Sequence, residues 1–336
     1  MMRTEKKIQM IVILLIAITL LAATISLSLG SFQIPLSKIP SILLGNGSKF
    51  ENNAIFHLRL PRIAIAIVVG IALSIAGSLL QTITGNELAD SGMIGINAGA
   101  SLAAVLFITS QSSNYYDELG HGAIMVLPAL AMAGAFLVAL LLYLLSVRQG
   151  LAPRRLILVG IGINIAINAF ITFYSLGISQ GQYNRVLVWT SGSLWGSNWT
   201  YFTVVAPAII IFAILSLMKH KTLDVLNLGD ELATGLGVNS NRQRKLLLLL
   251  AVVLAGLATS VAGNISFLGL LSPHIARKLV GPTHKKFMIT GALISAITIL
   301  LADSISRNLF SPIEIPVGIT ISLLGVPYFL SLVMRK

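Results

Sequence analysis

The sequence contains no cysteine and little charge. Of its 336 residues, 10% are charged and 56% are hydrophobic. Without cysteine the chain forms no disulfide bond and holds no metal ion through thiolates. A typical soluble domain has about 25% charged residues. A chain so poor in charge and so rich in apolar residues is therefore expected to lie in a membrane.

Long apolar runs recur along the whole chain. An α-helix needs roughly 20 apolar residues to cross a bilayer, and ten segments approach or reach that length. These segments are 8–29, 62–84, 94–109, 123–147, 155–177, 200–218, 244–263, 265–280, 287–307 and 314–333. The third and eighth are short and interrupted by glycine. The first is longer than the apolar part of a signal peptide and lacks a cleavage site, so we expect a retained helix. The sequence predicts an all-α polytopic membrane protein with about ten transmembrane helices in a single domain, 1–336.

The basic residues define an orientation. With the N-terminus inside, 17 of the 23 Lys and Arg residues fall in cytoplasmic segments, as the positive-inside rule expects. Both termini are then cytoplasmic. The six basic residues left outside are Lys38, Lys49, Arg59, Arg62, Arg185 and Arg307. Because the basic residues are spread over short loops, membrane topology explains the net charge of +12 better than nucleic-acid binding does.

The chain lacks an evident energy source of its own. It has no G-x-x-x-x-G-K-[ST] phosphate loop, and its few carboxylates near the spans lie at their ends, whereas ion-coupled carriers usually bury ionisable groups inside the membrane. Asn164 and Asn168 share one helix face and cannot titrate; they either bond to another helix or line a translocation path. A pump driven by a separate subunit is favoured over an ion-coupled carrier.

The longest inside loop is a candidate binding site for such a separate, energy-supplying subunit. Residues 222–229 and 230–237 each predict a short helix, the second with two acids in its first turn and glycines at its end. Leu232 and Leu236 give the second helix an apolar edge. This edge either folds back on the protein's own inner face or docks a cytoplasmic partner.

Several long strings resemble one family in the same order. They are "LRLPRIAIAIVVGIALSIAGSLLQTITGNELADSGMIGINAGASLAAV", "GDELATGLGV", "GNISFLGLLSPHIARKLVG" and "LADSISRNLFSPIEIPVGITISLLGVPYFL". They resemble the FecCD-type permease subunits of bacterial ABC importers for iron-siderophores and vitamin B12. The resemblance implies the type II ABC importer permease fold and a dimer with an identical or sister permease. It also implies two cytoplasmic ATPase subunits, an extracytoplasmic substrate-binding protein, and no cofactor.

The resemblance also assigns roles to particular residues. In the coupling segment, about 222–241, the ATPase would contact Asp230, Glu231, Leu232, Ala233, Gly235, Leu236 and Gly237. The cytoplasmic gate would contain Asn86, Leu88, Ala152 and Pro153. Glu87 stands where the family commonly has proline. The binding protein would dock on Arg59, Arg62 and Arg307, since guanidinium pairs well with acidic side chains.

Alternatives remain for these assignments. Arg59 and Arg62 could instead anchor a helix end among lipid headgroups, and Arg307 could pair with Asp303 four residues earlier. The histidines show no metal-ligand spacing on one helix face, so we expect no metal site. A ferric siderophore is the favoured substrate, with cobalamin or haem as alternatives. An ion-coupled secondary transporter is the rival from another class, and the spans hold no clustered side chains typical of a membrane-embedded enzyme.

Overall fold

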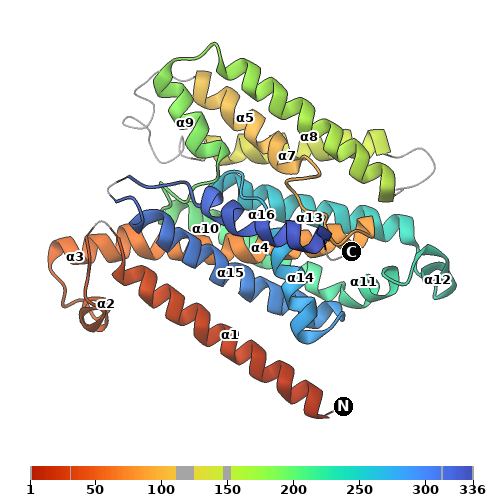
Figure 1. Cartoon of the computed structure of the whole chain (residues 1–336), viewed down its shortest axis with the longest axis horizontal. Coiled ribbons are helices and arrows are strands. Elements are labelled where there is room, and N and C mark those ends of the chain that lie inside the picture. Colours follow the sequence, from red (N-terminus) through yellow and green to blue (C-terminus); the bar gives the residue numbers. More distant parts are fainter. Residues whose placement is uncertain (1, 31, 111–124, 147–152, 312, 335–336) are drawn as a thin grey trace.

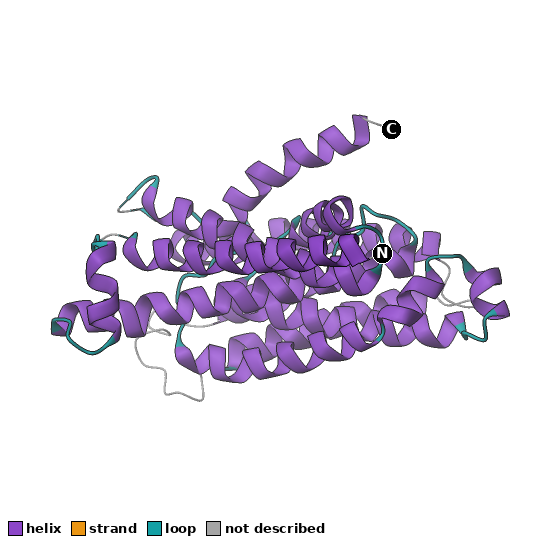
Figure 2. Cartoon of the chain, turned by 90° about the horizontal axis from the view of Figure 1, so that it is seen from below, coloured by secondary structure: helices purple, strands orange, loops and turns teal. Residues whose placement is uncertain are grey.

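The computed structural model describes residues 2–30, 32–110, 125–146, 153–311 and 313–334. Within these ranges every regular element is a helix (Figure 2). The long helices are α1 (Met2–Ser28), α4 (Leu60–Thr84), α5 (Ile96–Ser110), α7 (Val126–Ser146), α8 (Pro153–Ser175), α10 (Trp199–Met218), α13 (Ser240–Ala262), α14 (Leu268–Val280), α15 (His284–Asn308) and α16 (Val317–Met334). The shorter ones are α2 (Ile39–Leu43), α3 (Lys49–Asn53), α9 (Gln180–Thr190), α11 (His220–Leu226) and α12 (Asp230–Gly235). A 3₁₀ turn covers Leu36–Lys38, and a π-helical stretch, Ala54–Arg59, joins α3 to α4.

Each of the ten predicted spans coincides with one of the long helices. Among the described residues, seven helical segments are long and apolar enough to cross a membrane, the stretch from Lys49 to Thr84 counting as one. The other three predicted spans correspond to α5, α14 and α16. Because α14 has 13 residues, it extends about 20 Å, well short of a hydrocarbon core of about 30 Å. The ends of the predicted 123–147 span lie outside the described residues.

The helix α4 forms the centre of the bundle. It packs against α10, α13, α14 and α15, and 83% of its apolar window is buried, compared with 17% for α1. Small residues make this packing close. A Cβ at Gly77 would overlap the carbonyl oxygen of Gly269, and one at Gly70 would meet the backbone of Ala296. Glycine therefore serves helix packing here, as the small-residue spacing indicates.

The two ends of the bundle carry different short helices. In Figure 1, α2 and α3 lie at one end, whereas α11 and α12 lie at the other, toward which the N-terminal end of α1 also points. Figure 2 shows α16 leaving the bundle at an angle to the other helices. In the orientation predicted from the basic residues, the α2–α3 end is the outer one and the α11–α12 end is the inner one.

Candidate functional site: outer arginines, gate loop and inner helices

The three predicted docking arginines gather at the outer ends of α1, α4 and α15. Arg59 is 7% exposed, and its guanidinium donates hydrogen bonds to the backbone carbonyls of Leu27, Ser28 and Phe32. These carbonyls lie at and beyond the end of α1, where a helix leaves its last carbonyls without partners. Arg59 therefore fastens the end of α1 to the start of α4.

Arg62 and Arg307 share one buried acid. Asp303 is 1% exposed and lies 2.8 Å from Nη2 of Arg62 and 3.1 Å from Nε of Arg307. Arg62 also pairs with Glu314 at 2.9 Å, and Arg307 donates to the hydroxyl of Ser26 at 2.7 Å. The pairing of Arg307 with Asp303, expected as an alternative to docking, is present. The cluster binds three helices together, and little of each guanidinium reaches the surface.

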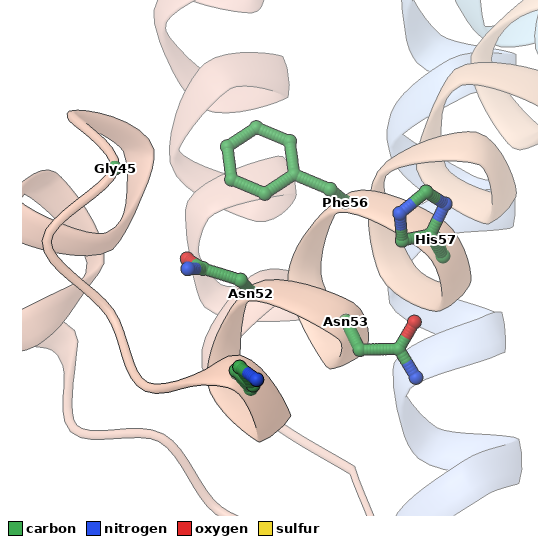
Figure 3. Close-up of a pocket in the computed structure, with 6 residues that line it drawn as sticks. Gly45, Asn52, Asn53, Phe56 and His57 are labelled. Carbon is green, nitrogen blue, oxygen red and sulfur yellow. The ribbon is translucent and has the colours of Figure 1, made fainter.

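More exposed groups surround this cluster at the outer end. An open hollow is lined by Gly45, Lys49, Asn52, Asn53, Phe56 and His57 (Figure 3). Beside it Leu44 and Phe50 are 80% and 61% exposed. Sequence reasoning did not identify this surface. Its local signal was present, because Ser48 and Glu51 form a capping box at the start of α3.

The predicted inner gate follows directly on α4. Gly85 ends the helix with a left-handed φ of 59°, and the Asn86 backbone N–H donates to the carbonyl of Gln81 at 3.1 Å. The Asn86 side chain then accepts the N–H of Leu88 at 2.9 Å. Glu87, which replaces the family's common proline, is exposed and lies 3.9 Å from His274. The loop is thus shaped by Asn86 rather than by a proline.

The second half of the gate is described only in part. Ala152 lies outside the described residues. Pro153 is the first residue of α8, where proline fits because the first helical N–H needs no intrahelical partner.

The loop that contains the predicted gate residues, 85–90, continues into the bundle and contacts the start of α14 through Asp90. Asp90 is 4% exposed and accepts the backbone N–H of Phe267 at 3.2 Å. Nearby, the Asn97 amide donates to Asn264 at 3.0 Å. A carboxylate at this place favours the N-terminus of α14. These contacts join segments about 170 residues apart in the sequence, so no local sequence pattern predicts them.

The predicted path residues lie on α8. The Asn168 amide donates to the carbonyl and the side-chain oxygen of Asn164, each at 2.8 Å. Asn168 is exposed, and Phe173 near the end of α8 and Leu176 directly after it are 76% and 81% exposed. Among the described residues, the bonds of Asn168 stay within α8. α8 therefore carries two polar amides, Asn164 and Asn168, on a helix whose apolar residues are largely exposed.

The inner loop contains the two short helices that the sequence predicts. In α11, Leu223 and Leu226 are 0% and 3% exposed, so this helix packs onto the protein. By contrast, Leu232 in α12 and Leu236, which caps its C-terminal end, are 61% and 63% exposed. The apolar edge of α12 does not fold back within the described chain.

The position of α12 is nevertheless fixed. Its Ala233 is fully buried, and Asp230 in its first turn pairs with Arg244 of α13 at 2.9 Å. Glu231 shares that first turn, and α12 ends at Gly235, followed by Gly237 with a positive φ of 80°. A helix held by a buried alanine and an ion pair thus leaves Leu232 and Leu236 exposed at this end of the bundle.

No metal site is apparent in the described ranges. Within them, no group of three or more His, Asp or Glu side chains is placed to hold a metal ion.

Comparison with known proteins gives consistent results. The model of the FecCD transport family matches residues 16–335. An iron(3+)-hydroxamate import system permease of Bacillus subtilis is 44% identical over 93% of this chain and 92% of its own. An iron-uptake system permease of the same organism is 36% identical over 96% of each chain.

A solved structure shares the fold. It is described as an inward-facing conformation of a metal-chelate type ABC transporter, and it aligns with a TM-score of 0.84 and 26% identity over 98% of this chain and 100% of its own. Since the family model and the relatives extend over nearly the entire length, the chain belongs to the FecCD transport family.

Proposed function

We propose that this chain is the membrane permease subunit of an ATP-driven importer that carries a ferric siderophore, of the hydroxamate class, across the cell membrane. The substrate class rests on the iron(3+)-hydroxamate permease, the relative with 44% identity. The chain itself performs no covalent chemistry, and ATP is hydrolysed by separate subunits.

The observation that carries the proposal is the exposure of Leu232 and Leu236 on a helix that is otherwise held in place. Two exposed leucines on a fixed helix form a small apolar surface suited to a cleft on a partner protein. Two ATPase subunits bind the coupling segment, one on this chain and one on a second permease, which is identical or a sister subunit. Asp230 and Glu231 orient the helix, and Ala233, Gly235 and Gly237 shape it.

The gate and path follow from the same arrangement. With both termini in the cytoplasm, the loop with Asn86 and Leu88 closes the inner end of the path between the two permeases, and Ala152 and Pro153 contribute the second half. Asn164 and Asn168 line this path. They offer amides to a polar chelate while their mutual hydrogen bonds keep them satisfied in its absence.

The binding protein docks on the outer end, around Arg59, Arg62 and Arg307. Their cluster carries three guanidiniums against the two carboxylates of Asp303 and Glu314, which leaves a positive excess for acidic residues on a partner. Because the guanidiniums are largely buried, they act mainly by fixing the outer ends of the helices and by their field. Such charges set register and association rate more than affinity.

The substrate is tested by uptake with the complete transporter. The permease, its ATPase and its binding protein are produced in cells that lack other siderophore importers. Accumulation of radioactive iron is then measured with a ferric hydroxamate, a ferric catecholate, ferric citrate and haem, and cobalamin uptake is measured alongside. We expect accumulation with the hydroxamate. Accumulation of haem or cobalamin alone overturns the substrate assignment while leaving the transporter class intact.

A further inference from the structure

The exposed helix α12 reaches the membrane bundle through its neighbours. It packs against α11 and α13, and α11 packs in turn against α4 and α15. The buried Leu223 and Leu226 anchor α11 to this surface. A displacement applied to α12 from outside therefore passes to α4 and α15 through α11.

Asp224 of α11 supplies the N-terminal cap of α15. Its Oδ1 accepts the backbone N–H of His284 at 2.9 Å and lies 2.6 Å from Nδ1 of the same residue. Thr283 occupies the cap position, but its side chain makes no capping hydrogen bond. A carboxylate is favoured at a helix N-terminus, where backbone N–H groups lack intrahelical partners. The first turn of α15 is thus bonded to α11.

The other nitrogen of the His284 ring faces α4. Nε2 lies 2.8 Å from Oγ1 of Thr82, and the ring, 2% exposed, packs against Phe287 with 4.8 Å between ring centroids. The Thr82 hydroxyl also donates to the Ser78 carbonyl at 3.0 Å, and the tautomer of the His284 ring sets which atom donates in its bonds to Asp224 and Thr82. One buried side chain therefore joins α11, α15 and α4.

Thr82 lies in the last turn of α4, directly before the gate loop. The Gly85 N–H donates to the Thr82 carbonyl at 3.3 Å, and the Asn86 N–H donates to the Gln81 carbonyl at 3.1 Å. The Gln81 side chain is held by Arg277 of α14 at 2.6 Å. Through these bonds the last turn of α4 is joined to His284 of α15, to Arg277 of α14 and to Asn86.

We propose that Asp224, His284 and Thr82 form the mechanical link through which movement of the ATPase-bound α11–α12 pair reaches the gate loop at the end of α4. The inference rests on the proposed function, because it requires an ATPase that holds α12. The three are positioning residues, since they touch neither nucleotide nor substrate.

The test exploits the absence of cysteine. Leu88→Cys places a single thiol in this chain at the gate loop. The assembled complex is labelled with a water-soluble maleimide, once without nucleotide and once after ATP and vanadate have trapped the ATPase closed. Labelling of this chain is resolved by gel electrophoresis, and ATPase copurification is measured in the same preparations. We expect trapping to change the labelling rate by at least about five-fold, the lower end of typical couplings between sites.

The link is then broken at either end. Asp224→Ala and Thr82→Val are each expected to reduce the trapping-dependent change to less than about two-fold, and the double variant to do no more than either alone, as for residues acting as one unit. Thr82→Ser, which keeps the hydroxyl, is the matched control and retains the change. If Asp224→Ala releases the ATPase, Thr82→Val still decides the question, because it lies away from α12.

A full trapping-dependent change in Thr82→Val with the ATPase bound overturns the inference. So does its loss in Thr82→Ser. The labelling measurement requires no transported substrate. A complex that imports no ferric chelate but passes the labelling test refutes the substrate proposal and not the link.

Discussion

Arg62 on α4 contacts Asp303 on α15 through two of its nitrogens. Nε and Nη2 lie 3.0 and 2.8 Å from Oδ1 of the acid. The other carboxylate oxygen of Asp303 lies 3.1 Å from Arg307. One buried acid therefore pairs with two guanidiniums from two helices. We infer that the stability of the outer end of the bundle depends on the negative charge of Asp303.

Asp303→Asn tests this dependence. The variant keeps the shape of the side chain but leaves two buried guanidiniums without their shared counter-charge. Removing one partner of a buried ion pair typically costs about 3–5 kcal/mol, so we expect a clear drop in the thermal midpoint of the detergent-solubilised complex. The control is Lys38→Ala, which removes an exposed pair with Glu51 at the same end and should cost less than about 1 kcal/mol. Equal midpoints for the two variants would show that the cluster does not stabilise the fold.

Glu314→Gln tests the docking role of the arginines. The side chain of Glu314 is 30% exposed, and its Oε2 pairs with Nη1 of Arg62 at 2.9 Å. If acidic residues of the binding protein meet Arg62, removing this competing charge should tighten docking. The gain should be about 1.4- to five-fold at low salt, as for an exposed pair worth about 0.2–1 kcal/mol, and should disappear at high salt.

Docking is measured with the purified binding protein by surface plasmon resonance at two salt concentrations. Arg62→Gln removes the positive charge instead of the competing acid, and it should weaken docking. Unchanged affinity in both variants would assign the arginines to helix fastening alone.

Sequence reasoning predicted the helices and the local pair of Arg307 with Asp303, but it could not predict the ion pairs between helices. Apolar length and the two-helix pattern of the inner loop are local properties, and the ten spans, α11 and α12 follow from them. The bond between Arg62 and Asp303 joins positions 241 residues apart, and the bond from Asp224 to His284 depends on how α11 packs. Such contacts are set by tertiary packing, so a single sequence gives no pattern for them.

The expected role of the arginines illustrates the same limit. Arginines on the outer side, where positive charge is disfavoured, suggest a function such as docking. Whether they can contact a partner directly depends on how deeply their side chains are buried. Arg59 and Arg307 are 7% and 6% exposed, which follows from the carbonyls at the end of α1 and from Asp303. Neither the carbonyl positions nor the burial can be derived from the spacing of the arginines.

Leu232→Asp or Leu236→Asp should detach the ATPase. Both side chains are more than half exposed, so the change should leave the stability of the permease within about 0.5 kcal/mol, as for most surface substitutions. A charge placed inside an apolar partner cleft should reduce copurification of the ATPase at least about ten-fold, since an unpaired buried charge costs several kcal/mol.

Leu44→Asp, which alters an 80% exposed leucine at the outer end, is the matched control. Normal copurification with the Leu232 and Leu236 variants would place the ATPase contact elsewhere.

Gly77→Ala should disrupt the central packing. Its Cβ would overlap the carbonyl oxygen of Gly269, a backbone atom that cannot rotate away. Forcing α4 and α14 apart is expected to cost about 1–3 kcal/mol, as overpacking does in other cores, and to lower the thermal midpoint. Gly181→Ala in α9 meets no atom within 4 Å and should be neutral or slightly stabilising. A stable Gly77 variant would mean that the two helices are not packed this closely.

If ATP hydrolysed by a partner subunit drives transport of a ferric chelate through this chain, uptake must depend on ATP and not on an ion gradient. The most direct measurement is uptake of radioactive ferric hydroxamate into proteoliposomes that contain the purified complex, with the binding protein outside and ATP inside. We expect uptake that requires ATP and persists when a proton ionophore has collapsed the gradient. Uptake that continues without ATP, or that the ionophore abolishes while ATP is present, would contradict it.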